Sequence, residues 1–413
     1  MRRITYISIS LLYLSAIIDP IGSFGLRYIS GGFSAFVLLC LFVTGLLQIN
    51  RGDLRLFIAI WLVLVMPTYG LFRYSMHANG AGFTDTADIS TSPLFLTTFL
   101  YFDRRATIYG QQSLINALRL LTIVCLAVTP IILLEHGNAL TAALIDRNVA
   151  ILGTRAYSNF TVPYIYFIAS PMLIYLVAYE LHQCWLTERK LIHIIWASVS
   201  IAALLLSGTR AHQFIALTLI PVSLVASKRN SGKLFFSVIL FLFCAALFIT
   251  NANAIIGALF SPTEADNAMK IALLSGYKII FSSLTQLFFG QGYNAQAWSN
   301  TLHGMVNTSI GASKTELTFL EVIRTYGIFV GAPLLLLLTR LGFALKSLPI
   351  TQRWLLTAYV FYMLDCATNA YLFSSNGMLP LALAAASANY FSSKKSNATL
   401  LAPTKKFVSS PAE

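Results

Sequence analysis

Four charged residues stand at the start of a long apolar run, in the stretch KTELTFLEVIRTYGIFVG at residues 314–331. They are Lys314, Glu316, Glu321 and Arg324. If a helix starts at Glu316, then Glu321 and Arg324 are three residues apart, so they lie on one face and can pair. An ionisable group inside a membrane span costs at least about 2.5–3.5 kcal/mol, so these side chains should face protein or a water-filled cavity. Two interpretations stay open: a pair that locks helices together, or one wall of a polar site.

Two further stretches each bring an arginine to the same side of the chain. In LLLSGTRAHQ (204–213), a Ser-Gly turn predicts that Arg210 lies at a membrane edge. An arginine there can bind a phosphate bidentately, or it can reach lipid headgroups by snorkelling. Arg155, in ILGTRAYSNFTVPYI (151–165), is expected on the same side.

Asp365, Thr368 and Asn369 form a polar face late in the chain, at positions i, i+3 and i+4 of LDCATNAYLFSSNGML. With the charged residues of 314–331 they make a set of cations and carboxylates suited to one kind of reaction. The cations would stabilise a diphosphate leaving group, and a carboxylate would take the proton from an attacking hydroxyl.

The segment 252–315 is far longer than an ordinary connection, which runs about 4–6 residues. Its stretch MKIALLSGYKIIFSSLTQLFFGQG has apolar residues at helical spacing, and we expect helices that lie on the outer membrane surface. GQGYNAQAW follows, where Gln291 and Tyr293 could bind a sugar by hydrogen bonding and stacking. Alternatively, its aromatic residues mark the membrane interface. His303 has no second ligand at metal spacing, so we expect no metal site.

The elements that must position these residues are membrane-spanning helices. The chain is 57% hydrophobic and 10% charged, with a mean hydropathy of +0.73, whereas soluble domains carry about 25% charged residues. The sequence predicts an all-α polytopic membrane protein with about twelve spans, the run at 91–102 being the weakest. The predicted spans are 4–19, 33–49, 56–72, 91–102, 113–134, 163–184, 191–206, 213–227, 234–251, 316–339, 354–372 and 377–393.

Charge gives the orientation and the domain organisation. With both termini in the cytoplasm, most of the 28 Lys and Arg residues fall on the cytoplasmic side, and the net charge of +13 is a topology signal. A nucleic-acid partner is therefore not expected, although anionic membrane lipid is a plausible one. We expect one transmembrane domain over 1–393 and a flexible cytoplasmic tail over 394–413. Gly327 and Gly331, four residues apart, predict a surface where another helix approaches closely.

The order LLLSGTRAH, FFGQGYNAQAW, TELTFLEVIRTYGIFVG and DCATNAYLFSSNGML resembles the Wzy-type repeat-unit polymerases of bacterial O-antigen, capsule and exopolysaccharide, which are relatives of the O-antigen ligases. The resemblance covers roughly 150–390. It implies a GT-C-like glycosyltransferase of the bacterial inner membrane that joins undecaprenyl-diphosphate-linked repeat units on the periplasmic side, with no cofactor. A flippase and a chain-length regulator of the same pathway would be partners.

The resemblance also implies roles for individual residues. Glu316 would be the base, and Arg210 and Arg324 would bind diphosphate. Glu321 would orient Arg324, and a further set would support the substrate: Arg155, Lys314, Gln291, Tyr293, Asp365 and Asn369. The ligases carry a His and a polar residue where this chain has Thr315 and Glu316, which favours a polymerase. A ligase and a lipid-linked-oligosaccharide flippase or transporter remain the alternatives.

Overall fold

The computed structural model describes residues 1–47, 52–77, 90–134, 139–157, 160–187, 190–226, 265–293 and 316–400. These residues are mostly helical. One large apolar core runs through most of the elements, and a small second core joins the start of α16 (Thr318–Lys346) to α13 (Ala265–Ser282).

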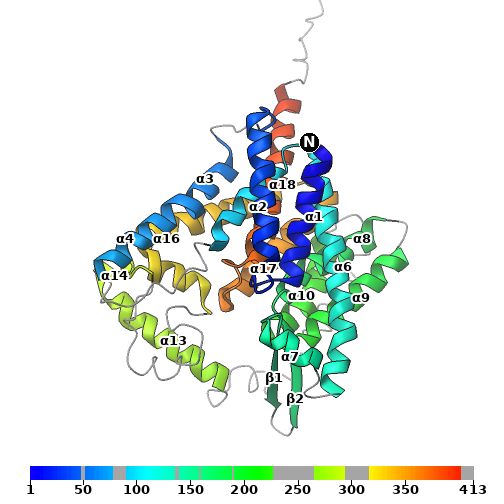
Figure 1. Ribbon diagram of the computed structural model, residues 1–413, viewed down its shortest axis with the longest axis vertical. Coiled ribbons are helices and arrows are strands. Elements are labelled where there is room, and N and C mark those ends of the chain that lie inside the picture. The colour runs from blue at the N-terminus through cyan, green and yellow to red at the C-terminus, as the bar shows by residue number, and fades with distance from the viewer. Residues whose placement is uncertain are drawn as a thin grey trace, which may run out of the picture.

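Three helices run side by side along the long axis of the molecule: α1 (Arg2–Ile18), α2 (Leu26–Val43) and α6 (Arg104–Leu134) (Figure 1). Small polar side chains bond them to one another. The Ser8 and Ser34 hydroxyls are 2.8 Å apart, and those of Ser10 and Tyr109 are 2.9 Å apart. Small residues with hydroxyl groups allow apolar helices to approach closely and hydrogen-bond across their interface.

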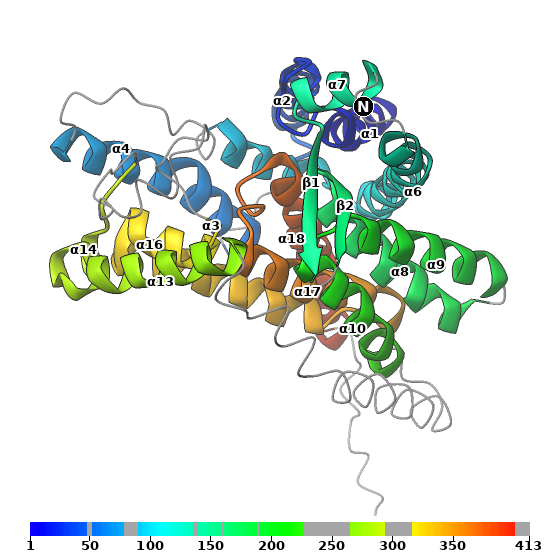
Figure 2. The same cartoon turned by 90° about the horizontal axis from the view of Figure 1, so that it is seen from below.

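A second set of helices crosses the first steeply, as both views show (Figures 1 and 2). It contains α16 and a continuous helical stretch with a π turn in its middle. The indole N–H of Trp61 donates to the Val330 carbonyl oxygen at 2.8 Å and ties the two together. The stretch consists of α3 (Leu54–Ile60), η1 (Trp61–Val65) and α4 (Met66–His77). Beside them lie α13 and α14 (Leu284–Phe289).

A third group of helices contributes to the large core from residues 139–226 and 350–400. The N-terminus and the C-terminal end of α18 lie at one end of the molecule, opposite a β hairpin (Figure 1). Side chains are described as far as Phe391, although α18 itself continues to Leu400, into the segment predicted as a tail. The group consists of α8 (Leu173–Leu186), α9 (Lys190–Leu206), α10 (Arg210–Ala226), α17 (Trp354–Thr368) and α18 (Ser375–Leu400), with the shorter α7 (Ala139–Asp146), η3 (Ser170–Met172) and η4 (Ile350–Gln352).

Within the described ranges, four helical stretches are long and apolar enough to cross a membrane: Leu26–Val43, Leu54–Met76, Arg104–Leu134 and Thr318–Lys346. Large apolar side chains on α2, such as Ile29, Phe36 and Phe42, are more than half exposed. Such surfaces are those of a membrane protein. The prediction of about twelve spans is not confirmed, because α8 and α17 have only 14 and 15 residues. A straight span needs about 20.

The all-α prediction is wrong between residues 150 and 167. There β1 (Ala150–Tyr157) and β2 (Phe160–Phe167) form an antiparallel hairpin in which Ala150 faces Phe167 and Thr154 faces Pro163. The predicted span 163–184 is therefore the end of a strand followed by α8. The strands are rich in β-branched and aromatic residues, which favour pleated structure. A short apolar run of this kind cannot be told from a helix by periodicity.

The predicted span at 91–102 is also wrong as a membrane crossing. Its residues form the 3₁₀ helix η2 (Ser92–Leu100), which packs against α18. Nine residues at about 2.0 Å each cover far less than the hydrocarbon core of a bilayer, about 30 Å. The predicted span 234–251 lies outside the described residues.

Gly327 divides α16 into two helical halves, and Figure 1 shows them meeting at an angle next to α14. Gly327 has φ 70° and ψ 176°, a conformation essentially restricted to glycine. A Cβ atom there would lie 2.2 Å from the Phe288 carbonyl oxygen. The predicted close approach at this glycine is therefore made by the chain that follows α14, rather than by a straight helix face. Glu321 and Arg324 lie on the first half, and the apolar run forms the second.

Replacing Gly327 with alanine should lower the stability of the protein by about 1–3 kcal/mol, because alanine would be strained in this conformation. Thermal unfolding of the detergent-solubilised protein, followed by size-exclusion chromatography after heating, measures the loss. Gly32→Ala is the matched control, since Gly32 lies in α2 with nothing within 4 Å of an added Cβ. Equal stability of the two variants would contradict the role given to the break.

Candidate functional site

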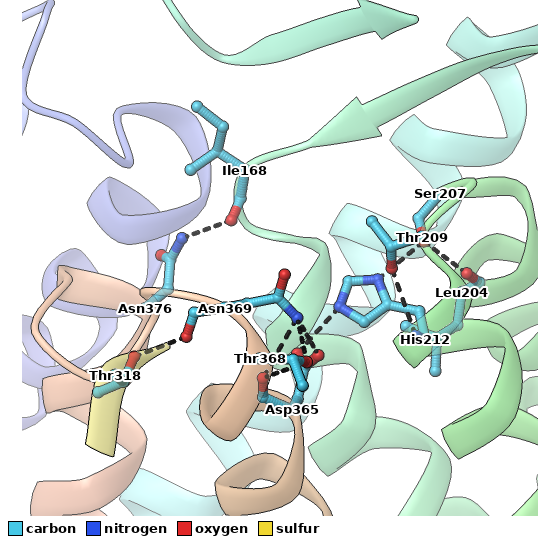
Figure 3. Close-up of polar contacts among 10 residues, drawn as sticks. All are labelled: Ile168, Leu204, Ser207, Thr209, His212, Thr318, Asp365, Thr368, Asn369 and Asn376. Atoms are coloured by element: carbon cyan, nitrogen blue, oxygen red, sulfur yellow. Dashed lines mark hydrogen bonds and ion pairs between the residues drawn. The ribbon is translucent and has the colours of Figure 1, made fainter. Parts of the chain in front are cut away.

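A chain of hydrogen bonds connects the turn between α9 and α10 to the end of α17 and the start of α16 (Figure 3). We call it the histidine cluster; it consists of Ser207, His212, Asp365, Asn369 and Thr318. His212 Nδ1 lies 2.8 Å from Ser207 Oγ, and its Nε2 lies 3.0 Å from Asp365 Oδ2. Asn369 Nδ2 donates to Asp365 Oδ1 at 2.9 Å, and the Thr318 hydroxyl donates to the Asn369 carbonyl oxygen at 2.8 Å.

The local sequence places these side chains. Gly208 has a φ of 73°, so the chain turns sharply between α9 and α10, as the Ser-Gly pair predicts. A Cβ on Gly208 would lie 2.3 Å from the Tyr164 ring, so the hairpin packs directly on this turn. On α17, Asp365 and Asn369 are four residues apart, and their bond confirms that they share a face.

Both ring nitrogens of His212 take part in hydrogen bonds. The single hydroxyl proton of Ser207 goes to the Leu204 carbonyl oxygen, 2.6 Å away, so Nδ1 must donate to Ser207 Oγ. The other ring nitrogen, Nε2, bonds to Asp365 Oδ2, while Asp365 Oδ1 accepts from the Asn369 amide. His212 and Asp365 therefore form a hydrogen-bonded pair in which both side chains are fully buried.

Serine, histidine and aspartate are also the residue types of a hydrolase triad, but this cluster does not have that chemistry. A nucleophilic serine gives its proton to the histidine. Here the Ser207 proton goes to Leu204, and Ser207 is only 3% exposed. The cluster instead joins α10, α17 and the start of α16 through buried hydrogen bonds.

Glu316 lies beside the histidine cluster, because its carbonyl oxygen accepts from the Thr318 N–H at 2.9 Å, and Tyr371 packs on the same cluster. Its ring lies 6.3 Å from the His212 ring and 6.2 Å from the Tyr166 ring, centroid to centroid. Burial raises the pKa of Tyr371, and the Asp365 carboxylate and then Glu316 raise it further. The two carboxylates therefore act on one tyrosine. Glu316 is exposed just before α16, whereas Asp365 is fully buried.

A second polar group, which we call the arginine cluster, lies on the first half of α16. It consists of Tyr277, Gln291, Glu321 and Arg324. Arg324 Nε donates to Glu321 Oε2 at 2.8 Å, its Nη2 pairs with the other carboxylate oxygen, and its Nη1 donates to Gln291 Oε1 at 3.0 Å. The Tyr277 hydroxyl donates to Glu321 at 2.8 Å. The predicted pair is confirmed, and the Arg324 side chain is completely buried.

The break in α16 and the Gly-Gln-Gly segment that follows α14 satisfy each other's backbone. The Gln291 N–H donates to the Arg324 carbonyl oxygen at 2.7 Å, and the Gly292 N–H donates to that of Thr325 at 2.9 Å. Without these bonds, the interruption of the helix would leave both carbonyl groups without a hydrogen-bond partner. A helix can break inside an apolar protein only where such partners are supplied.

Two side chains of α4 bind the end of α14 and the Gly-Gln-Gly segment, and neither contact is predicted from the sequence. The Tyr69 hydroxyl donates to the Phe289 carbonyl oxygen at 2.6 Å, and Arg73 Nη2 donates to that of Gly290 at 2.8 Å. Gly292 lies against Arg73, because an added Cβ would be 2.6 Å from Arg73 Cβ. No residue spacing predicts these contacts, because they join segments that are far apart in the sequence.

The predicted site residues thus divide between two clusters. Asp365 and Asn369 belong to the histidine cluster, with Glu316 beside it, and Arg210 begins α10 two residues before His212. Gln291, Glu321 and Arg324 form the arginine cluster. Tyr293 is buried and accepts a bond from the Tyr326 hydroxyl at 2.9 Å. The backbone of Arg155 lies in β1, opposite Val162. Lys314 lies outside the described residues.

Sequence reasoning missed the pairing of His212 with Asp365. His212 lies two residues after Arg210 in the turn motif, so its position near the site could be predicted. Its partner on another helix could not. Among the described residues, no group of three or more His, Cys, Asp or Glu side chains could hold a metal ion. No protein-family model and no curated protein matches the chain.

Replacing His212 with leucine should cost about 3–5 kcal/mol of stability, because the Asp365 carboxylate would remain buried without its partner. The double variant His212→Leu with Asp365→Leu should lose less than the sum of the two single variants, since neither charge is left. Unfolding of all four proteins in the same detergent gives the coupling energy. Additive losses would mean that no ion pair joins the two side chains.

Within the arginine cluster, Glu321→Gln should destabilise the protein more than Tyr277→Phe. The first change leaves the Arg324 guanidinium buried beside a neutral amide, whereas the second removes one hydrogen bond to a charged group, worth about 1.5–3 kcal/mol. Thermal unfolding of both variants ranks the losses. A larger loss for Tyr277→Phe would contradict the central place of the ion pair.

Proposed function

We propose that the protein is a membrane glycosyltransferase that polymerises oligosaccharide repeat units carried on undecaprenyl diphosphate, on the periplasmic face of a bacterial inner membrane. The proposal rests on the resemblance of residues 150–390 to the Wzy-type polymerases and on one structural observation. That observation is an exposed carboxylate, Glu316, next to a buried charge cluster within a chain of membrane-like apolar character.

The position of Glu316 supports its role as the base. Of the two carboxylates that act on Tyr371, Asp365 is fully buried and paired with His212, whereas Glu316 is exposed. A base must come within hydrogen-bond reach of the hydroxyl it deprotonates, which requires a carboxylate that a sugar can approach. Glu316 meets this requirement, whereas Asp365 joins α10 to the end of α17 through its bonds to His212 and Asn369.

We assign phosphate binding to Arg210 and a positioning role to Arg324. Arg210 is partly exposed at the start of α10, where its guanidinium can stabilise negative charge on a departing diphosphate. Arg324 is completely buried and held by Glu321 and Gln291. It therefore fixes the Gly-Gln-Gly segment, while Asn369, Arg155, Lys314 and Tyr293 keep the supporting roles that the resemblance implies.

The alternatives use the same lipid-linked substrate differently. A ligase would transfer finished polymer to a lipid acceptor, and a flippase would move repeat units across the membrane. The polar groups that the structure describes around Glu316 gather at one junction of helices, as a transferase site requires. A transporter distributes its polar groups along a path with access from both faces.

Loss of the protein should leave surface polysaccharide that carries single repeat units instead of a ladder. Complementation with Glu316→Gln or Arg210→Ala should fail to restore the ladder, because the first variant lacks the base and the second lacks the cation at the leaving group. Electrophoresis of the polysaccharide from each strain is the measurement, with equal membrane amounts of every variant verified by immunoblot.

Arg340→Ala serves as the control, because Arg340 is an exposed arginine on the second half of α16. It should restore the ladder fully. Long undecaprenyl-linked polymer left unattached in the deletion strain would identify a ligase, and repeat units trapped on the inner leaflet would identify a flippase. Either result would overturn the proposed polymerase.

A further inference from the structure

We propose that a groove between α16 and α17 holds the polyprenyl chain of the lipid-linked substrate; this inference rests on the proposed function. The groove has a volume of about 600 Å³. Its walls come from the second half of α16, such as Leu335 and Leu338, from α17, such as Leu356 and Met363, and from Phe319 on the first half. Apart from Thr339 and Lys346, the lining residues are apolar or aromatic.

The floor of the groove is built from a glycine and a tyrosine. The Tyr359 hydroxyl donates to the Leu338 carbonyl oxygen at 2.7 Å, which fixes the ring between the two helices. Gly342 lies tightly against that ring, because an added Cβ would come within 3.3 Å of it. A larger side chain at this position would project into the space that the groove offers to a hydrocarbon chain.

One end of the groove lies beside the candidate site. Phe319 follows Thr318, and Leu364 precedes Asp365, so two lining residues are the chain neighbours of two members of the histidine cluster. At this end the Thr318 hydroxyl donates to the Asn369 carbonyl oxygen. A hydrocarbon chain in the groove would therefore carry its polar head to the histidine cluster and Glu316.

This proximity selects the occupant. A second apolar groove, of about 420 Å³, lies between α1 and α2, lined by residues such as Leu14, Ile18 and Phe33. None of its lining residues adjoins a member of either polar cluster in the chain. Bulk membrane lipid would enter both grooves alike, whereas a substrate whose head is held at the site would occupy the α16–α17 groove. Lys346, at the far end, can extend its ammonium group to the aqueous surface.

The test is photolabelling of the full-length protein in nanodiscs with a diazirine-bearing polyprenyl phosphate, followed by mass spectrometry of the labelled peptides. Label should appear on α16 and α17, and unlabelled polyprenyl phosphate should displace it while phosphatidylglycerol does not. Gly342→Trp should reduce this labelling about tenfold, as expected when roughly two methylene groups lose their burial. Leu336→Trp is the matched control, because Leu336 is 68% exposed on the same helix and lies outside the groove.

Equal labelling of the α1–α2 groove, or displacement by phosphatidylglycerol, would show generic lipid binding and overturn the inference. So would unchanged labelling of Gly342→Trp. The polysaccharide ladder separates this result from the function itself. Loss of labelling in Gly342→Trp with a ladder still made by the deletion strain would overturn the polymerase and leave the groove standing. If the ladder depends on the protein but no label appears in the groove, the polymerase stands and the groove inference is overturned.

Discussion

The interruption of α16 at Gly327 is the constraint on which the polar architecture depends. It separates a short half-helix that carries Glu321 and Arg324 from an apolar half that is free of charge until Arg340. The interruption is possible because two backbone N–H groups of the Gly-Gln-Gly segment bond to the carbonyl groups of Arg324 and Thr325. The charged residues therefore stay out of the apolar run, where each would be costly.

The two clusters stabilise this arrangement in different ways. The arginine cluster joins α13 to α16 through the Glu321 carboxylate, and the segment after α14 to α16 through the Arg324 guanidinium, so that its ion pair and the backbone bonds support each other. The histidine cluster joins α10 to α17 through the buried His212–Asp365 pair, and the end of α17 to α16 through the bond from Thr318 to Asn369. Such pairs add little net stability when both partners are present, but removing one partner leaves an uncompensated charge. We infer that the clusters specify one packing of these elements rather than add stability.

Short-range features of this chain could be predicted from the sequence. The pairing of Glu321 with Arg324, the common face of Asp365 and Asn369, and the turn at Gly208 all depend on residues at most four apart. Helical geometry or the preference of glycine for positive φ determines them. The helix α13 was also predictable from its apolar spacing, and it packs on Leu317 at the start of α16.

Features that depend on distant partners could not be predicted. The sequence predicts a span from residue 163, in the second strand of the hairpin, because an apolar run becomes a strand only when a second strand pairs with it. Gly327 was expected to help helices pack, and only the chain after α14 shows that it interrupts one. His212 lies 153 residues from Asp365, and nothing local in either segment indicates that they meet.

The placement of the charges explains why the chain carries them at all. A purely structural ion pair could be replaced by apolar residues of similar volume at little cost, often with a gain in stability. Here the buried His212–Asp365 pair joins the start of α10 to α17, with the exposed Glu316 and one end of an apolar groove beside it. A site that binds a hydrocarbon chain and a charged head group needs an apolar surface and a polar surface in contact. A rigid polar framework at their boundary keeps the polar side chains in place. The broken helix provides that boundary, because it turns the chain from one environment to the other within a single residue.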